Sequence, residues 1–296
     1  MSDGNRLDGP LAGSEEREAD SRVPTATVIV PPRGWVQLSL RDVWDQRELL
    51  GFLTWRDIRV RYKQTVLGSL WAVLQPLVAM CVFTVFFNRV AGIAPEGDVP
   101  YPLWSFAGLL PWTLFSQSVI RSAASLVNNP ELVTKVHFPR LIMPTAAVLS
   151  ACFDFVFGLV VYLGLMVYFG RVPGPTVVFL PLALLLVVAA ALGVGLWLAA
   201  INVKYRDVRH MVPFLVQMWL FVSPVVYPSS AVGEGYRTLY SLNPMVGVID
   251  GFRWCLLGIG DGPGPVIWIS CGTTLAVLVS GAFFFRRMEA SFADVV

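Results

Sequence analysis

Charged residues are scarce in this sequence, at 14% of its 296 positions against about 25% in soluble proteins. Acids and bases nearly balance, and a net charge of +2 gives no support for a nucleic-acid partner. Hydrophobic residues make up 55% of the chain. The shortage of charge therefore predicts a membrane domain rather than a soluble enzyme or a nucleic-acid-binding protein.

Metal ligands and catalytic motifs are also scarce. The chain has four cysteines, with no Cys-x-x-Cys pair, and two histidines, His137 and His210. This pattern predicts neither a zinc site nor a disulfide framework. The motifs Gly-x-Ser-x-Gly and His-Glu-x-x-His do not occur, and only one acid, Asp154, lies near the centre of an apolar stretch. We expect no catalytic residue and no bound metal.

Lysine occurs only at Lys63, Lys135 and Lys204, and none of these follows a glycine. A phosphate-binding loop of the Gly-x-x-x-x-Gly-Lys-Ser/Thr type needs such a pair. We therefore expect no cofactor in this chain. Any ATP and Mg²⁺ that the protein depends on would be bound by a partner subunit.

In place of charge the sequence has six long apolar stretches. Lys63 and Arg89 are separated by 25 uncharged residues, and Asp98 and Arg121 by 22. A helix needs about 20 predominantly apolar residues to cross a bilayer. We predict an all-α integral membrane fold with six transmembrane helices, at about 66–88, 103–122, 141–169, 177–201, 211–228 and 266–285.

Basic residues are unevenly distributed over the connections between these spans. Short cytoplasmic loops retain Lys and Arg during insertion. The basic side is therefore predicted to be cytoplasmic, with both termini on it, in the inner or plasma membrane of the cell. Its basic residues are Arg56, Arg59, Arg61, Lys63, Lys135, Arg140, Lys204, Arg206, Arg209, Arg286 and Arg287.

Two segments outside the spans have their own patterns. Residues 1–34 are rich in acids, Gly, Ser and Pro, which predicts a disordered cytoplasmic tail before a transmembrane domain at 35–296. Residues 35–64 interleave Trp and Leu with arginines, which predicts an amphipathic helix in the headgroup layer. This helix is either an ordinary anchor beside the first span or an element that moves as a pore opens.

The connection between the fifth and sixth spans is long and apolar. Asn243-Pro244 provides a helix start and the glycine-rich run 258–264 a stop. We predict an external re-entrant helix that dips into the outer leaflet without crossing it, with Asp250 and Arg253 on a polar face. Its apolar face is formed by Met245, Ile249, Phe252 and Leu256.

Within the spans, one acid and several aromatic residues are candidates for function. Asp154 is either a proton, cation or sugar-hydroxyl site or a partner of a Ser, Thr or Asn on another helix. Most aromatic residues fit interfacial belts, but a few are expected to line a path along which sugar rings could stack. The candidates for the translocation path are Trp71, Gln75, Phe83, Phe87, Asp154, Trp219 and Tyr227.

Four stretches resemble a known family in both sequence and order. They are RDIRVRYKQTVLG at 56–68, continuing to Leu77; LVTKVHFPR at 132–140; NVKYRD at 202–207, with Ser223-Pro224-Val225; and Leu242-Asn243-Pro244, with Phe252-Arg253. Over residues 35–290 the chain resembles ABC-2 type polysaccharide export permeases. These are the membrane subunits of O-antigen, capsule, teichoic acid and galactan exporters.

The resemblance implies a complex of two permease copies and two ATPase subunits, and it also implies roles for two segments. Coupling to the ATPase would fall on Glu131, Leu132, Lys135, Val136, His137, Phe138, Pro139 and Arg140. An interfacial gate helix, whose cations would receive the pyrophosphate of a lipid carrier, would include Arg56, Arg59, Arg61, Tyr62 and Lys63. From the residues alone, the first segment is either a docking element or a solvated loop.

We therefore expect a permease that exports a lipid-linked polysaccharide, with membrane lipid, a second copy of itself and the ATPases as partners. A channel would open between two copies of spans one and five. The alternatives are an ABC exporter of a small lipid or drug, a membrane glycosyltransferase, and an ATP-independent channel.

Overall fold

The computed structural model describes residues 40–63, 70–136, 138–205, 207–260, 262, 264–289 and 292, and every regular element in these ranges is a helix. All described residues belong to one unit, Val36–Val296. The tail predicted at 1–34 lies outside the described residues.

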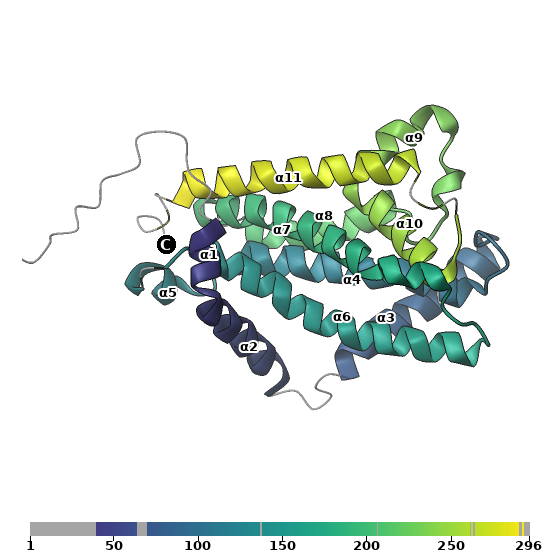
Figure 1. Cartoon of the computed structure of the whole chain (residues 1–296), viewed down its shortest axis with the longest axis horizontal. Helices are drawn as coiled ribbons and strands as arrows, with labels where there is room; N and C mark the ends of the chain where they lie inside the picture. The colour runs from purple at the N-terminus through teal and green to yellow at the C-terminus, as the bar shows by residue number, and fades with distance from the viewer. Residues whose placement is uncertain are drawn as a thin grey trace, which may run out of the picture. The chain divides into compact units, whose positions relative to one another are not determined.

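The helices follow the predicted stretches closely (Figure 1). The first half of the chain contains α1 (Leu40–Asp45), α2 (Arg47–Lys63), α3 (Leu70–Phe83), the π-helical η1 (Thr84–Val90), α4 (Tyr101–Ala124), α5 (Pro130–Lys135) and α6 (Ile142–Tyr168). The second half contains the short 3-10 helices η2 (Pro175–Phe179) and η3 (Ser229–Ala231), with α7 (Leu180–Lys204), α8 (Val208–Val222), α9 (Glu234–Ser241), α10 (Pro244–Leu257) and α11 (Pro265–Glu289).

Four helical segments are long and apolar enough to cross a membrane, and each coincides with a predicted span. They are Val73–Val90, Ile142–Tyr168, Pro175–Lys204 and Pro265–Glu289. Two other predicted spans correspond to α4, whose hydroxyl and amide side chains lower its mean hydropathy, and to α8, which has only 15 residues. The four segments support a multi-pass membrane protein.

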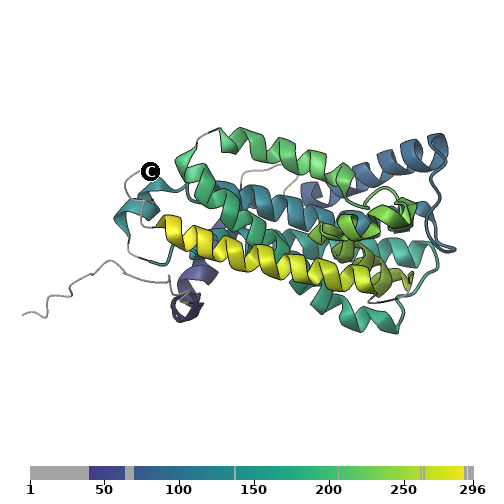
Figure 2. The ribbon, with the colours of Figure 1, turned by 90° about the horizontal axis from the view of Figure 1, so that it is seen from above.

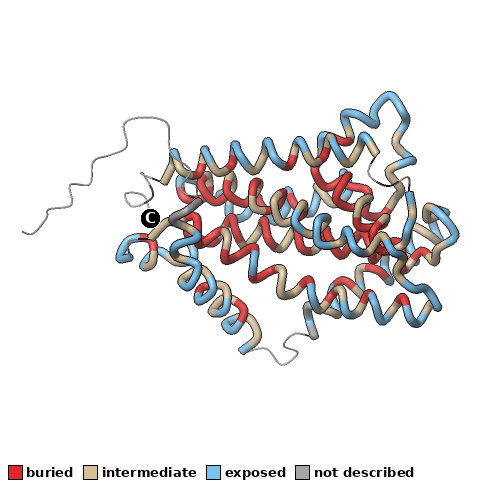
Figure 3. Tube along the Cα trace, viewed as in Figure 1, coloured by how far each residue is buried: buried red, intermediate tan, exposed pale blue. Residues whose placement is uncertain are grey.

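The core forms around α4, which packs against α3, α6, α7, α8 and α10. Its buried side chains include Trp104, Phe106 and Phe115. Figure 3 shows buried residues concentrated in the inner helices, whereas the outer faces of α2 and α11 carry exposed ones. Exposed apolar side chains along a spanning helix suit lipid contact, because a helix that is apolar all round belongs in a core or a membrane.

Small residues set the spacing between α7 and its neighbours. The sequence places Ala191, Gly195 and Ala199 on one stripe of α7, and a Cβ added to Gly195 would lie 2.5 Å from Ser122 Oγ of α4. A Cβ added to Gly193 would lie 2.7 Å from the backbone nitrogen of Leu278 in α11. Close approach at small residues is the usual packing mode between membrane helices. Figure 2 shows α7 between α8 and α11.

Candidate functional site

Three helices bring charged side chains together around Asp154 in the middle of α6. Arg121, near the end of α4, places Nη1 2.8 Å from the Asp154 carboxylate. Arg61 and Tyr62, both in the last turn of α2, also donate to this carboxylate. The cluster of Arg61, Tyr62, Arg121 and Asp154, here called the charge cluster, contains two cations and one anion.

Side-chain hydrogen bonds hold both arginines in the charge cluster. Arg61 Nη2 donates to Ser150 Oγ at 3.1 Å, and Arg121 Nη2 donates to Gln117 Oε1 at 3.1 Å. The Asp154 side chain is only 16% exposed. A charge in the middle of a spanning helix costs about 2.5–3.5 kcal/mol, and pairing with a cation offsets that cost. One of the two alternatives for Asp154 was a Ser, Thr or Asn partner on another helix, whereas its partners in the structure are two arginines and a tyrosine.

The position of Tyr62 keeps its hydroxyl protonated. Burial and the adjacent Asp154 carboxylate raise the pKa of Tyr62 to about 12, because both disfavour the tyrosinate. The phenol therefore remains a hydrogen-bond donor to the carboxylate at any physiological pH.

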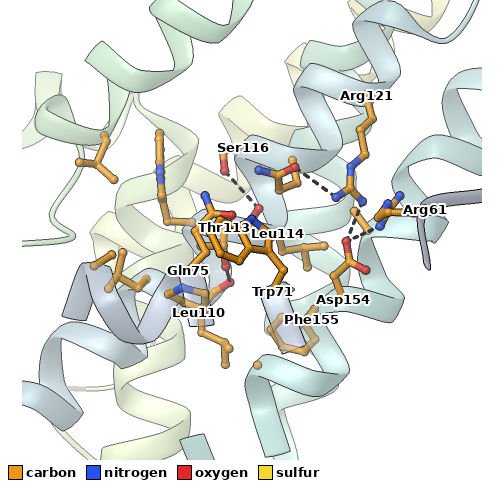
Figure 4. A pocket seen from close by; sticks show the side chains of 18 of the residues that line it. Arg61, Trp71, Gln75, Leu110, Thr113, Leu114, Ser116, Arg121, Asp154 and Phe155 are labelled. Atoms are coloured by element: carbon orange, nitrogen blue, oxygen red, sulfur yellow. Dashed lines mark hydrogen bonds and ion pairs between the residues drawn. The ribbon is translucent and has the colours of Figure 1, made fainter. Parts of the chain in front are cut away.

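A cavity of about 760 Å³ opens beside the charge cluster, between α2, α3, α4, α6 and α8. Figure 4 shows Arg61, Arg121 and Asp154 at one end, with Trp71, Gln75, Thr113 and Phe155 along the remainder. Most of its wall is apolar, and besides the charge cluster its polar side chains are Gln75, Thr113, Ser116 and Gln117. We call this space the inner cavity.

A second cavity, of about 560 Å³, lies between α2, the end of α4 and the start of α6, and is called the basic-side cavity here. Arg61 and Arg121 line both cavities, whereas Asp154 lines only the inner one. The remaining polar wall of the basic-side cavity is formed by Arg56, Asp57, Ser125, Asn128, Asn129 and Ser150. The two arginines thus stand where the two spaces meet.

The predicted path residues do not all line one cavity. Trp71, Gln75, Phe83 and Asp154 line the inner cavity. The other three do not line it. Phe87 packs edge-on against Phe83 at 5.6 Å, Trp219 Nε1 donates to Asn243 Oδ1 at 3.1 Å, and the hydroxyl of Tyr227 lies 3.0 Å from that of Tyr240.

The residues predicted for a gate helix also differ in orientation. Arg61 and Tyr62 reach the charge cluster, but Arg59 is exposed with its guanidinium 5.8 Å from the Trp55 ring. Arg56 pairs with its neighbour Asp57 at 2.9 Å, and Lys63 is exposed. Only the last turn of α2 therefore supplies polar contacts to the middle of α6.

The segment predicted to couple to an ATPase consists of α5 and the loop after it. Val133 is buried, and Leu132 and Phe138 are half-buried. These half-buried side chains pack against two apolar clusters, one built around Phe285 and Val203 and the other around Leu53 and Ile142.

The outward side of this segment carries Glu131 and Lys135, whose side chains are 82% and 70% exposed, together with the exposed Val136. The backbone N–H of Arg140 donates to Glu289 Oε1 at 3.1 Å, and its guanidinium donates to the Glu289 carbonyl. Pro139 is half-buried, and His137 lies outside the described residues. The segment therefore offers a small exposed surface on a well-packed base.

The predicted re-entrant helix corresponds to α10. Asn243 caps its start, because its Oδ1 accepts from Met245 N at 3.0 Å, and Gly258 ends it at a positive φ of 67°. Its predicted apolar face is buried. However, Arg253 is only 1% exposed and does not lie on a solvent-exposed face. Its guanidinium lies 3.5 Å from the centroid of the Trp104 ring, and its Nη2 donates to Val225 O at 2.9 Å.

The main functional candidate that the sequence interpretation missed is Arg121. It lies at the last turn of the span predicted at 103–122, where a basic residue is typical of a membrane boundary, but α4 continues to Ala124 and keeps Arg121 within the bundle. The lone intramembrane acid was the available signal, since such an acid normally has a cation partner. Within the described ranges, no group of three or more His, Cys, Asp and Glu residues could hold a metal ion.

Comparison with known proteins adds a family to this geometry. The family described as ABC-2 type transporter matches residues 48–257. The O-antigen export system permease protein RfbA of Myxococcus xanthus is 36% identical over 217 residues, which cover 72% of this chain and 82% of that protein. An RfbA of Klebsiella pneumoniae is 26% identical over 84% of this chain and 95% of its own length. The polysialic acid transport protein KpsM of Escherichia coli is 24% identical over 79% and 91%, respectively.

Proposed function

The chain belongs to the ABC-2 type transporter family, and from this premise we propose that it is the permease subunit of an exporter of lipid-linked polysaccharide. The observation that carries the proposal is the similarity to polysaccharide export permeases over most of their length. A separate ABC ATPase hydrolyses ATP, and the permease opens the path across the membrane. The assembly contains two copies of each subunit.

The proposed topology has six spans in the inner or plasma membrane, with both termini in the cytoplasm. In this topology, α4 and α8 are the fifth and sixth spans in addition to the four strongly apolar segments. The basic residues of α2 and α5 lie on the cytoplasmic side, in accordance with the positive-inside rule. On the opposite side, α9 and α10 form the re-entrant element between the last two spans.

The proposed docking surface for the ATPase is the exposed side of α5. Its support is the combination of a packed base, through Val133, with an exposed apolar side chain, Val136, directly after Lys135, which pairs with Glu131. Interfaces commonly have an apolar centre and a polar rim. ATP-driven closure of the ATPases would move α5 and, through it, α2.

Replacing Val136 by Glu tests the docking surface. We expect the ATPase to be lost from the purified complex and surface glycan to fall, because a buried unpaired carboxylate is costly at an interface. The matched control is Val172→Glu, at an exposed valine in the connection between α6 and η2, outside the spanning helices and away from α5. Normal ATPase recovery with Val136→Glu, measured at equal permease amounts, would refute this docking surface.

Deleting the chain in its native cell tests the function itself. We expect lipid-linked glycan to accumulate on the inner leaflet and surface glycan to disappear, both restored by the wild-type chain. Unchanged glycan together with retention of a small lipid or a drug would favour the alternative exporter. Glycan synthesis by the purified chain alone would favour an enzyme, and conductance without an ATPase would favour a channel.

A further inference from the structure

The charge cluster lies at the boundary between the two cavities. Arg61 and Arg121 contribute to the walls of both, and Asp154 binds both arginines from the inner side. In this arrangement the side chains fill the place where a passage between the cavities would run. Any continuous path through this part of the protein requires the cluster to rearrange.

The two arginines differ in how firmly they are held. Arg121 belongs to α4, the helix around which the core is packed, and it is also bonded to Gln117 one turn away. Arg61 belongs to the end of α2. The buried apolar contacts of α2, at Leu53 and Ile58, lie earlier in the helix.

The last turn of α2 is held mostly by polar contacts. Arg59, Val60 and Lys63 are exposed there, whereas Arg61 and Tyr62 bind Asp154, and Arg61 also binds Ser150. The Tyr62 ring adds one tilted contact with Phe153, at 6.2 Å between centroids. Hydrogen bonds and ion pairs break and re-form without disrupting a packed core, so this end of α2 can move while its earlier turns stay packed.

A separation of α2 from α6 would normally leave a buried carboxylate without a partner, which is strongly unfavourable. Here a second cation is available to prevent this, because Arg121 Nη1 also lies 2.8 Å from the Asp154 carboxylate and belongs to α4 rather than to α2. The surplus cation in the cluster therefore lowers the cost of opening. A single Arg–Asp pair at this place would hold α2 more tightly closed.

We propose that Asp154 is a latch residue that closes the passage between the inner and basic-side cavities by binding Arg61 and Tyr62, and that Arg121 retains the carboxylate when α2 moves away. Asp154 and Arg121 are positioning residues for the permease. The role of the latch in export rests on the proposed function, whereas its effect on access to the inner cavity does not.

Access to the inner cavity can be measured with a single cysteine at Ser116→Cys, since Ser116 lines the inner cavity but not the basic-side one. The four native cysteines are replaced by alanine in the full-length chain. Labelling rates are measured in membrane vesicles of defined orientation with two membrane-impermeant thiosulfonate reagents, one cationic and one anionic. Neither an ATPase nor a glycan is required.

We expect Asp154→Asn and Arg61→Gln each to raise the labelling rate from the basic side about tenfold, which corresponds to about 1.4 kcal/mol of latch stability. Both reagents should show the rise. A purely electrostatic effect would raise the rate of one reagent and lower that of the other in each variant. The affected reagent would also switch between the variants, because Asp154→Asn adds net positive charge and Arg61→Gln removes it. The control Arg59→Gln, on the same helix but away from the cluster, should label like the parent.

Arg121→Gln gives the opposite expectation, since it leaves the Arg61–Asp154 contact in place and removes the retaining cation. Its labelling rate should be at or below that of the parent. The exchanged pair R61D/D154R should return the rate to the parent level, and a monodisperse size-exclusion profile verifies folding of each variant. Parental rates in both Asp154→Asn and Arg61→Gln would overturn the latch. An equal rise in Arg121→Gln would overturn the retaining role.

The labelling result and the export result separate the two proposals. A tenfold rise with normal surface glycan would support the latch as an access element and contradict its role in export. Loss of export in cells with unchanged labelling would leave the permease function standing and reject the latch.

Discussion

Replacing Gly281 by Ala should destabilise the bundle, whereas the same change at Gly272 should stabilise it. Both glycines lie in α11, but an added Cβ at position 281 would collide with the carbonyl oxygen of Gly193 and lie 3.0 Å from Trp197 Cδ1. At position 272 no neighbouring atom lies within 4 Å. The two variants therefore differ in packing but not in the chemical change.

The expected magnitude follows from two effects. Alanine favours a helix over glycine by about 0.8–1 kcal/mol, and this gain applies at both positions. The collision at position 281 involves backbone atoms, which cannot rotate away, so α7 and α11 must separate at an overpacking cost of about 1–3 kcal/mol. Because the helix gain cancels in the comparison, the difference between the variants should be about 1–3 kcal/mol.

Thermal unfolding in detergent measures this difference. Each kcal/mol changes Tm by about 2–4 °C for a domain of 150–250 residues, so Gly281→Ala should melt about 2–12 °C below Gly272→Ala. Aliquots of purified, fluorescently tagged protein are heated, and the monodisperse fraction is followed by size exclusion. The close packing of α7 against α11 would be contradicted if Gly281→Ala melted at or above Gly272→Ala.

Further predictions concern the last turn of α2 and the start of α10. The difference in ultraviolet absorbance between wild type and Tyr62→Phe should show tyrosinate appearing near pH 12 rather than near pH 10, because burial and the Asp154 carboxylate raise that pKa; a midpoint near 10 would contradict the contact. Asn243→Ala should lower stability by about 1 kcal/mol through loss of the cap on Met245, in addition to the lost bond from Trp219, in a thermal melt. Asn243→Asp keeps an acceptor and should retain most of the stability, so equal losses in both variants would exclude a capping role.

The helices of this protein could be predicted from the sequence because helix formation depends on residues that are close together along the chain. Apolar runs of spanning length predict helices directly, and Asn243-Pro244 and Gly258 mark the ends of α10 where the structure has them. The four-residue spacing of Ala191, Gly195 and Ala199 likewise predicts that another helix approaches this stripe closely, but only the structure identifies that helix as α4.

The charge cluster could not be assembled from the sequence because its members are distant along the chain. Arg61 lies 93 positions before Asp154, and nothing in the local pattern of α2 selects Arg61 over Arg59 as the inward residue. Arg253 was assigned to a polar face for a similar reason. Its burial depends on the Trp104 ring and the Val225 carbonyl, which the tertiary fold supplies.

The double packing of Leu132 and Phe138 has a kinetic consequence. These side chains pack against the cluster that includes Leu53 of α2 and against the cluster that includes Phe285 near the end of α11. Packed interiors have low compressibility and transmit strain. A displacement of α5 should therefore reach α2 and α11 at the same time. Time-resolved spectroscopic reporters placed on α2 and on α11 should then relax with the same rate constant after a displacement of α5.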